Sequence, residues 1–278
     1  MDLEDLRFEN IVRDLAVDQG AFAHEMSKTT PPIRSYVIVF TARSGSTWLT
    51  TLLSGTSRLG RPEEYINPDF VRDVAKALNS REPGGFLQLL KRRRKTANGI
   101  FGMEVREVDV RLFGQEVFFR VFDSETVFFN LWRKNIVAQA ISLYRAVATK
   151  RFHSNEGEVN RAPPDYDADA IQNWLTHLAE AENDNIAMLR RNQRTFRNIC
   201  YEDIVRDRNG TMKMFADTLG VEMNVDEFTG PVEGELRKIG DAWNDEAEQR
   251  FRTERGDFLG RIESARQAKK IVAPEGMG

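Results

Sequence analysis

Cysteine and histidine are scarce in this sequence of 278 residues, which holds one cysteine, Cys200, and three histidines. A single cysteine has no intramolecular partner, so a disulfide framework is excluded and a reducing compartment is the simplest interpretation. One cysteine with three scattered histidines also makes no metal-ligand cluster. We therefore expect no metal site.

The sequence also lacks a large excess of positive or negative charge, because 40 Lys and Arg are balanced by 43 Asp and Glu, for a net charge of −3. This balance gives no reason to expect nucleic acid or an anionic membrane as a partner, and any anion site must be local. No window approaches roughly 18 consecutive apolar residues. The acidic start of the chain also lacks the basic and apolar pattern of a signal peptide. We expect a cytoplasmic protein without a membrane span.

Apolar residues make up 41% of the chain and alternate between strand-like and helix-like patterns. Residues 36–40 and 126–132 are short β-branched and aromatic runs, typical of strands buried on both faces. Helical spacing follows each of them, at 48–53 and at 136–150. Further helices are predicted over 70–79, 86–95, 169–191 and 211–219, with an apolar stretch at 99–103 and a strand at 196–201. This order predicts an α/β fold with a parallel sheet flanked by helices.

Proline and turn-forming residues mark the boundaries between predicted segments of the chain. Pro31 and Pro32 end the amphipathic turns that precede them. We expect an N-terminal helical arm over 1–34, one catalytic domain over 35–260 and a C-terminal tail over 261–278. The stretch 153–168, rich in Asn, Gly, Pro and Asp, is predicted to be a surface loop, and loops of this length are often functional.

A phosphate-binding loop is predicted between the first strand and its helix. Free backbone amides and the positive end of a helix dipole meet there. Gly45 allows a close backbone approach, and Arg43 offers a charged fork for phosphate oxygens. The candidate ligands of this anion are Arg43, Ser44, Gly45, Ser46 and Thr47. The alternative is an ordinary Ser/Gly turn that caps a helix.

The loop differs from that of nucleoside triphosphatases. The pattern Gly-x-x-x-x-Gly-Lys-Ser/Thr is absent, and no lysine stands at the helix start. The 126–132 strand ends in Arg133 rather than in a carboxylate that could hold magnesium. The sequence thus favours metal-free binding of a smaller phosphate group.

A second anion site is predicted around Arg133, at the end of a strand where open α/β sheets bind ligands. Asn135 can cap the following helix, and Gln139 and Ser142 share one face of it. Arg133 and Ser142 can then grip a second phosphate. Alternatively, the two are a surface charge and an ordinary helix-face hydroxyl.

Together these motifs resemble a family. Arg-Ser-Gly-Ser-Thr-Trp at 43–48, Gly60-x-Pro62-x-Glu64-Tyr65, and Arg133 with Gln139-Ala140-x-Ser142 resemble bacterial carbohydrate sulfotransferases of the trehalose and lipopolysaccharide sulfotransferase type, over about residues 35 to 255. These enzymes use 3′-phosphoadenosine 5′-phosphosulfate (PAPS), without a metal, and release adenosine 3′,5′-bisphosphate (PAP). The resemblance implies a P-loop-like sulfotransferase fold, with the 5′-phosphosulfate at Arg43 to Thr47 and the 3′-phosphate at Arg133 and Ser142.

Two further elements follow from the resemblance. Arg237 and Lys238 are similar to a basic motif that also meets the 3′-phosphate, although such pairs on helix faces are usually solvated. Glu64 stands where the family has its general base, while Arg43 is placed to stabilise charge on the departing phosphate. Glu63 and Glu64 are otherwise ordinary solvated loop charges.

The acceptor side departs from the family. Phe152 replaces a tryptophan of the acceptor pocket, beside His153, which alternatively caps the preceding helix. Glu104 and the Lys134-Asn135 pair stand where the family often has Lys and Arg-Asp. The basic run 91–95 either attracts an anionic acceptor or forms a solvated helix face.

The sequence therefore predicts a sulfotransferase that acts on a hydroxyl of a carbohydrate, a glycolipid or another small molecule. The sequence itself does not give the oligomeric state, although relatives of this type often dimerise, which makes a homodimer possible. Two alternatives stay open. One is a small-molecule kinase with an atypical phosphate loop, and the other is a non-catalytic protein that binds a bisphosphate nucleotide.

Overall fold

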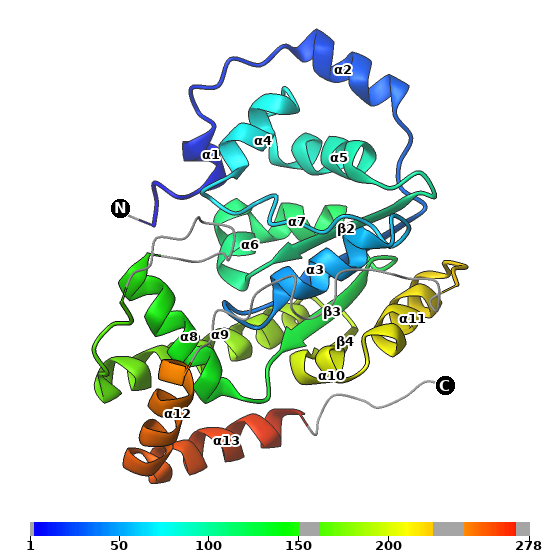
Figure 1. Ribbon diagram of the computed structural model, residues 1–278. Coiled ribbons are helices and arrows are strands. Elements are labelled where there is room, and N and C mark those ends of the chain that lie inside the picture. The colour runs from blue at the N-terminus through cyan, green and yellow to red at the C-terminus, as the bar shows by residue number, and fades with distance from the viewer. Residues whose placement is uncertain (1–2, 151–161, 225–241, 271–278) are drawn as a thin grey trace.

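A four-stranded parallel β-sheet organises the chain (Figure 1). The computed structural model describes residues 3–150, 162–224 and 242–270. The strands are β1 (Arg34–Val39), β2 (Ile100–Val105), β3 (Val127–Trp132) and β4 (Phe196–Cys200), in the order β2-β1-β3-β4. Every neighbouring pair runs parallel. The predicted α/β fold with a parallel sheet is thus confirmed.

Helices cover both faces of the sheet. They are α1 (Phe8–Ile11), α2 (Gln19–Lys28), α3 (Ser46–Gly55), α4 (Val71–Ala77), α5 (Pro83–Arg94), α6 (Glu107–Phe113), α7 (Gln115–Val121), α8 (Ile136–Thr149), α9 (Ala168–Arg191), α10 (Tyr201–Arg206), α11 (Arg208–Leu219), α12 (Ala242–Glu254) and α13 (Gly256–Lys270). All helices expected from apolar spacing are present. The sequence patterns did not predict α6, α7, α10, α12 or α13.

Alternate residues of β1 point into two different cores, as the two-residue period of a strand requires. Val37 and Val39 face a cluster that includes the buried side chains of α5, α6 and α7. Tyr36 and Ile38 face the other side, where α3 and α11 pack against the sheet (Figure 1). A third cluster joins α8 and α9 to α12 and α13.

The N-terminal residues pack onto the first of these cores. Phe8 is 2% exposed and its ring lies 5.3 Å from that of Phe86 and 4.5 Å from that of Phe113. At the other end, α13 carries helical structure from residue 256 to residue 270, into the segment expected to be a tail. The division into 1–34, 35–260 and 261–278 stays a prediction.

The order of the strands reverses beside β1. From β1 the chain moves outward to β2 and then returns to the opposite side of β1 to form β3. Both strands end at the same edge, with Val39 opposite Asn130. In open parallel sheets, ligands bind in the crevice outside such a reversal point. A ligand site is therefore expected at the segments that follow β1 and β3.

Candidate functional site

The loop between β1 and α3 has a backbone that only glycine can complete. Gly45 is the N-cap of α3 and has a φ of 91°, in the left-handed region. A Cβ atom at this position would run into the ring of Tyr201, which packs against the loop. Gly45 therefore allows both the turn and the close contact with Tyr201.

The same loop holds polar groups that lack partners. The first N–H groups of α3 have no acceptor within the helix, and the helix dipole adds positive potential there. Ser44 is fully buried, and its Oγ has no hydrogen-bond partner in the part of the chain that the structure describes. A phosphate oxygen would satisfy these groups, so the loop fits an anion.

Arg43 connects this loop to the second predicted anion site. Its Nε donates a hydrogen bond of 2.9 Å to Oγ of Ser142, and its carbonyl oxygen accepts one of 3.3 Å from Nη1 of Arg133. Burial, and then the charge of Arg133, lower the pKa of Arg43. Two guanidinium groups thus lie close together in a partly buried place, which favours a bound anion. The structure brings together Arg43, Arg133 and Ser142 as the sequence predicted.

Gln139 and Asn135 stabilise the arrangement from α8. The buried amide of Gln139 donates to Oγ1 of Thr41 at 2.9 Å and to the carbonyl of Ala42 at 2.7 Å. The predicted cap is present, since Oδ1 of Asn135 accepts a hydrogen bond of 3.0 Å from the Ala138 N–H. The phosphate loop is therefore bonded to α8 at its start and, through Arg43, again at its middle.

Two residues that follow β4 also belong to this site. The guanidinium of Arg133 lies 4.8 Å from the centre of the Tyr201 ring, within range of a cation–π contact. Glu202 accepts hydrogen bonds from the backbone N–H groups of Lys134 at 2.9 Å and of Asn135 at 3.0 Å. Burial alone would raise the pKa of Glu202, but these two bonds, together with those from the Cys200 thiol and the Glu202 backbone, lower the pKa. The sequence patterns did not indicate either residue, although Tyr201 ends the predicted strand 196–201 and Glu202 directly follows it.

Glu64 lies in the segment that links α3 to α4. Nδ2 of Asn67 donates a hydrogen bond of 2.7 Å to Oε2 of Glu64. The segment runs beside β2, since the Glu104 N–H donates a hydrogen bond of 3.2 Å to the Glu63 carbonyl. Glu63 is exposed, whereas Glu64 is half-buried. Of the two adjacent glutamates, Glu64 is the one whose carboxylate is held by a neighbour.

Glu104 is a buried carboxyl between these parts of the site. It is 6% exposed, and burial, followed by the charge of Glu64, holds its pKa well above the ordinary value. The Ser46 hydroxyl acts in the opposite direction. The protonated, neutral form of Glu104 is therefore favoured. From its position on β2, Glu104 thus interacts with the charge of Glu64 and with the hydroxyl of Ser46, the first residue of α3.

The structure does not place every predicted site residue. Phe152, His153, Arg237 and Lys238 lie outside the described residues, as does most of the loop 153–168. Thr47 is exposed on the first turn of α3. Within the described ranges, no three His, Cys, Asp or Glu side chains group in a way that could hold a metal ion. No helix in those ranges has the length and apolar character to cross a membrane.

The basic run 91–95 is occupied by contacts within the chain. Lys91 donates to the Val121 carbonyl at 3.2 Å, and the guanidinium of Arg94 lies 5.5 Å from the centre of the Tyr65 ring. Arg92 and Lys95 bond the carbonyls of Thr29 and Thr30 in the N-terminal segment. These contacts give the run a structural role.

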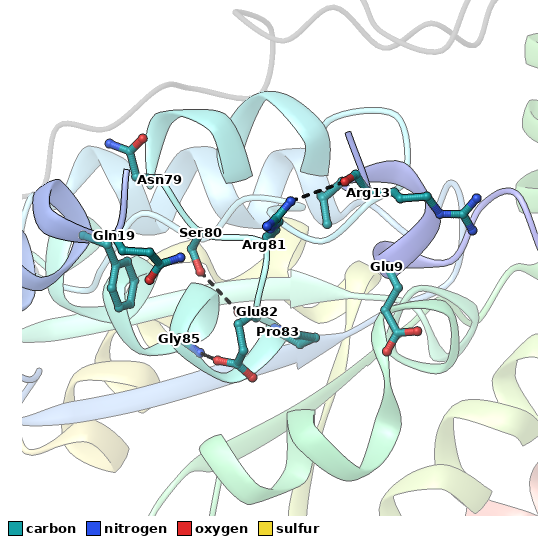
Figure 2. A pocket seen from close by; sticks show the side chains of 11 residues that line it. Glu9, Arg13, Gln19, Asn79, Ser80, Arg81, Glu82, Pro83 and Gly85 are labelled. Carbon is teal, nitrogen blue, oxygen red and sulfur yellow. Dashed lines mark hydrogen bonds between the residues drawn. The ribbon is translucent and has the colours of Figure 1, made fainter. Parts of the chain in front are cut away.

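A cavity of about 630 Å³ lies between the N-terminal helices and the turn before α5 (Figure 2). Arg81 reaches across it to the Arg13 carbonyl at 3.5 Å, and Glu82 caps α5 through the Gly84 N–H at 2.8 Å. No residue of the phosphate loop lines it. This cavity is therefore separate from the site described above.

Comparison with known proteins gives consistent matches. The family model described as Stf0 sulphotransferase matches residues 35–254. Trehalose 2-sulfotransferase of Mycobacterium tuberculosis (strain ATCC 35801 / TMC 107 / Erdman) is 23% identical, over 54% of this chain and 71% of that protein.

Two solved structures are also similar. The sulfotransferase domain of the Synechococcus PCC 7002 olefin synthase has 15% identity and a TM-score of 0.44, covering 77% of this chain and 82% of that domain. Mouse sulfotransferase SULT7A1 complexed with PAP has 11% identity and a TM-score of 0.43, covering 90% and 94%.

Proposed function

Because the chain belongs to the Stf0 sulphotransferase family, we propose that it transfers the sulfuryl group of PAPS to a hydroxyl of a carbohydrate or glycolipid. The observation that carries this proposal is the convergence of Arg43, Arg133 and Ser142 beside the start of α3. The trehalose 2-sulfotransferase match supports a carbohydrate as acceptor.

The two ends of the nucleotide are assigned to different groups. Residues 43–47 hold the 5′-phosphosulfate through the free N–H groups of α3, the Ser44 hydroxyl and the Arg43 guanidinium. Arg133 and Ser142 hold the 3′-phosphate. Arg237 and Lys238, by resemblance, add positive charge near the same phosphate. The unpartnered Ser44 Oγ and the two neighbouring guanidiniums support this fit.

The reaction needs one base and one group that stabilises charge. When bound, PAPS supplies a sulfuryl group whose bond to phosphate oxygen breaks as the acceptor oxygen bonds to sulfur. Glu64 takes the proton of the acceptor hydroxyl, with its carboxylate oriented by Asn67. Arg43 and the N–H groups at the start of α3 stabilise the negative charge that develops on the phosphate. Phe152 and His153 are assigned to the acceptor pocket by resemblance.

Glu104 has a supporting part in this scheme. A second ionised carboxylate close to Glu64 and to the phosphosulfate would repel both. Burial favours the neutral form of Glu104, which reduces this repulsion. Glu64 can then be the carboxylate that accepts the proton.

The test is sulfate transfer from labelled PAPS to a panel of sugars, glycolipids and small alcohols, followed by mass spectrometry. A gain of one sulfate on a sugar or glycolipid supports the proposal. Phosphate transfer that requires ATP and magnesium would instead identify a kinase. Tight PAP binding by calorimetry without transfer to any acceptor would indicate a non-catalytic nucleotide-binding protein.

A further inference from the structure

Arg266 is a buried arginine on α13, beyond residue 254, where the family match ends. It is 8% exposed. Its Nε and Nη2 donate hydrogen bonds of 2.8 Å and 2.7 Å to the two carboxylate oxygens of Glu182 on α9. This bidentate pair fixes the plane of the guanidinium.

The remaining donors of the same guanidinium are directed at the end of β3. Nη2 donates to the Arg133 carbonyl at 2.6 Å, and Nη1 donates to the Lys134 carbonyl at 3.1 Å. The guanidinium also lies 5.9 Å from the centre of the Trp132 ring. Arg266 therefore contacts the backbone that carries Arg133 and not its side chain, which faces Arg43, Tyr201 and Glu202.

The other side of this backbone is held by an opposite charge. Glu202 accepts the N–H groups of Lys134 and Asn135, while Arg266 bonds the carbonyls of Arg133 and Lys134. The two peptide units that follow β3 are thus fixed by a carboxylate on one side and a guanidinium on the other. A strand end that only needed to turn into α8 would not require this many charged partners.

We propose that Arg266 is a positioning residue that fixes the backbone at Arg133, so that the Arg133 side chain points at the 3′-phosphate. This inference rests on the proposed function, which assigns that phosphate to Arg133. A buried ion pair by itself is weak evidence for a contribution to stability. The two carbonyl contacts give this pair a specific role, because side-chain direction at Arg133 depends on its backbone.

The experiment compares two nucleotides that differ only in the 3′-phosphate. Calorimetry gives the Kd of PAP and of adenosine 5′-phosphate for each variant. The Kd of adenosine 5′-phosphate divided by the Kd of PAP measures recognition of the 3′-phosphate. The double variant Arg266→Met/Glu182→Leu removes the clamp without leaving a buried unpaired charge. We expect this ratio to fall on the order of tenfold, since displacement of a charged group weakens its bonds steeply. Adenosine 5′-phosphate binding should be unchanged.

A matched control removes another ion pair between the C-terminal helices and α9. Arg255 pairs with Asp169, and neither residue contacts the segment after β3 in the described structure. Arg255→Met/Asp169→Asn should keep the full ratio. Arg266→Lys keeps a charge beside Glu182 but cannot span both carbonyls, so its ratio should also fall. This single variant carries the test should the double variant fail to fold.

The outcomes separate the inference from the function on which it rests. If Arg133→Met lowers the ratio while both Arg266 variants, folded by circular dichroism, keep it, the positioning role is overturned. If Arg133→Met itself keeps the ratio, the assignment of the 3′-phosphate to Arg133 is wrong. A loss of affinity for both nucleotides alike would show that Arg266 stabilises the fold without positioning Arg133.

Discussion

Nε of Arg43 donates a hydrogen bond of 2.9 Å to Oγ of Ser142, across 99 positions of sequence. This bond joins the phosphate loop that follows β1 to the helix that follows β3. The two predicted anion sites are therefore parts of one site. A change on α8 should be felt at the loop, because the Arg43 guanidinium is oriented from there.

Ser142→Ala should weaken PAP binding by about tenfold, the scale of one hydrogen bond to a charged group. Ser142→Thr keeps the hydroxyl and should retain most of the affinity. Calorimetry with PAP measures both. Ser27→Ala on α2, where the hydroxyl donates to the nearby His24 carbonyl, is the control and should bind normally. Equal affinities for the native chain and Ser142→Ala would refute a binding role for this serine.

Gly45→Ala should abolish measurable PAP binding. The substitution places a Cβ against the Tyr201 ring and also forces alanine into a left-handed conformation. Gly220→Ala separates these two effects, because Gly220 has a φ of 66° but nothing within 4 Å of the added Cβ. That control should lose about 1 kcal/mol of stability and bind PAP normally. Normal binding by Gly45→Ala would show that the loop does not need this close contact.

Glu64→Gln should lower turnover by about a hundredfold or more, the scale of a lost general base. PAP affinity should not change, since Glu64 is assigned to the acceptor hydroxyl. Its exposed neighbour provides the control, because Glu63→Gln changes the net charge of the loop by the same amount as Glu64→Gln. Steady-state kinetics with labelled PAPS measures both. Comparable losses in the two variants would mean that loop charge, and not a specific base, is responsible.

The sequence predicted the fold, and it predicted that Arg43 and Arg133 lie close together, for a physical reason. β1 and β3 are buried on both faces, so they read as continuous apolar runs, and residues after parallel strands meet at one edge of the sheet. The convergence of Arg43 and Arg133 follows from these two facts alone. Local patterns therefore carried this part of the prediction.

Contacts that depend on the tertiary fold could not be predicted in this way. Arg266 lies in a charged segment that gives no signal of burial, and its partner Glu182 is 84 positions away. Glu104 sits in an apolar stretch, but only the packing of the loop 60–67 against β2 shows that it is buried beside Glu64. In the sequence, the basic run 91–95 has the pattern of a solvated charged face. Its carbonyl partners in the N-terminal segment lie far from it in the chain, so only the fold shows these contacts.

The stability of the protein should depend on pH through Glu104. Its pKa in the folded chain is raised by burial and then by Glu64, above the ordinary value of 4.5. The folded state then keeps a proton that the unfolded state releases, so the free energy of unfolding falls as pH rises from the ordinary pKa through the raised one. Glutamine has no such proton. Glu104→Gln should therefore gain stability relative to the native chain as pH rises.

Urea unfolding of both proteins at about pH 5 and about pH 8 measures this effect, and the stability difference should be larger at the higher pH. Glu180→Gln on the exposed side of α9 is the control and should show the same small difference at both values. Because Glu64 contributes to the shift, Glu64→Gln should reduce the pH dependence of the native chain in part. A stability difference for Glu104→Gln that stays constant with pH would mean that Glu104 is ionised in the folded protein. The assignment of a neutral carboxyl beside Glu64 would then be wrong. Two ionised carboxylates at this place would need a bound cation or a cationic acceptor group to balance their repulsion.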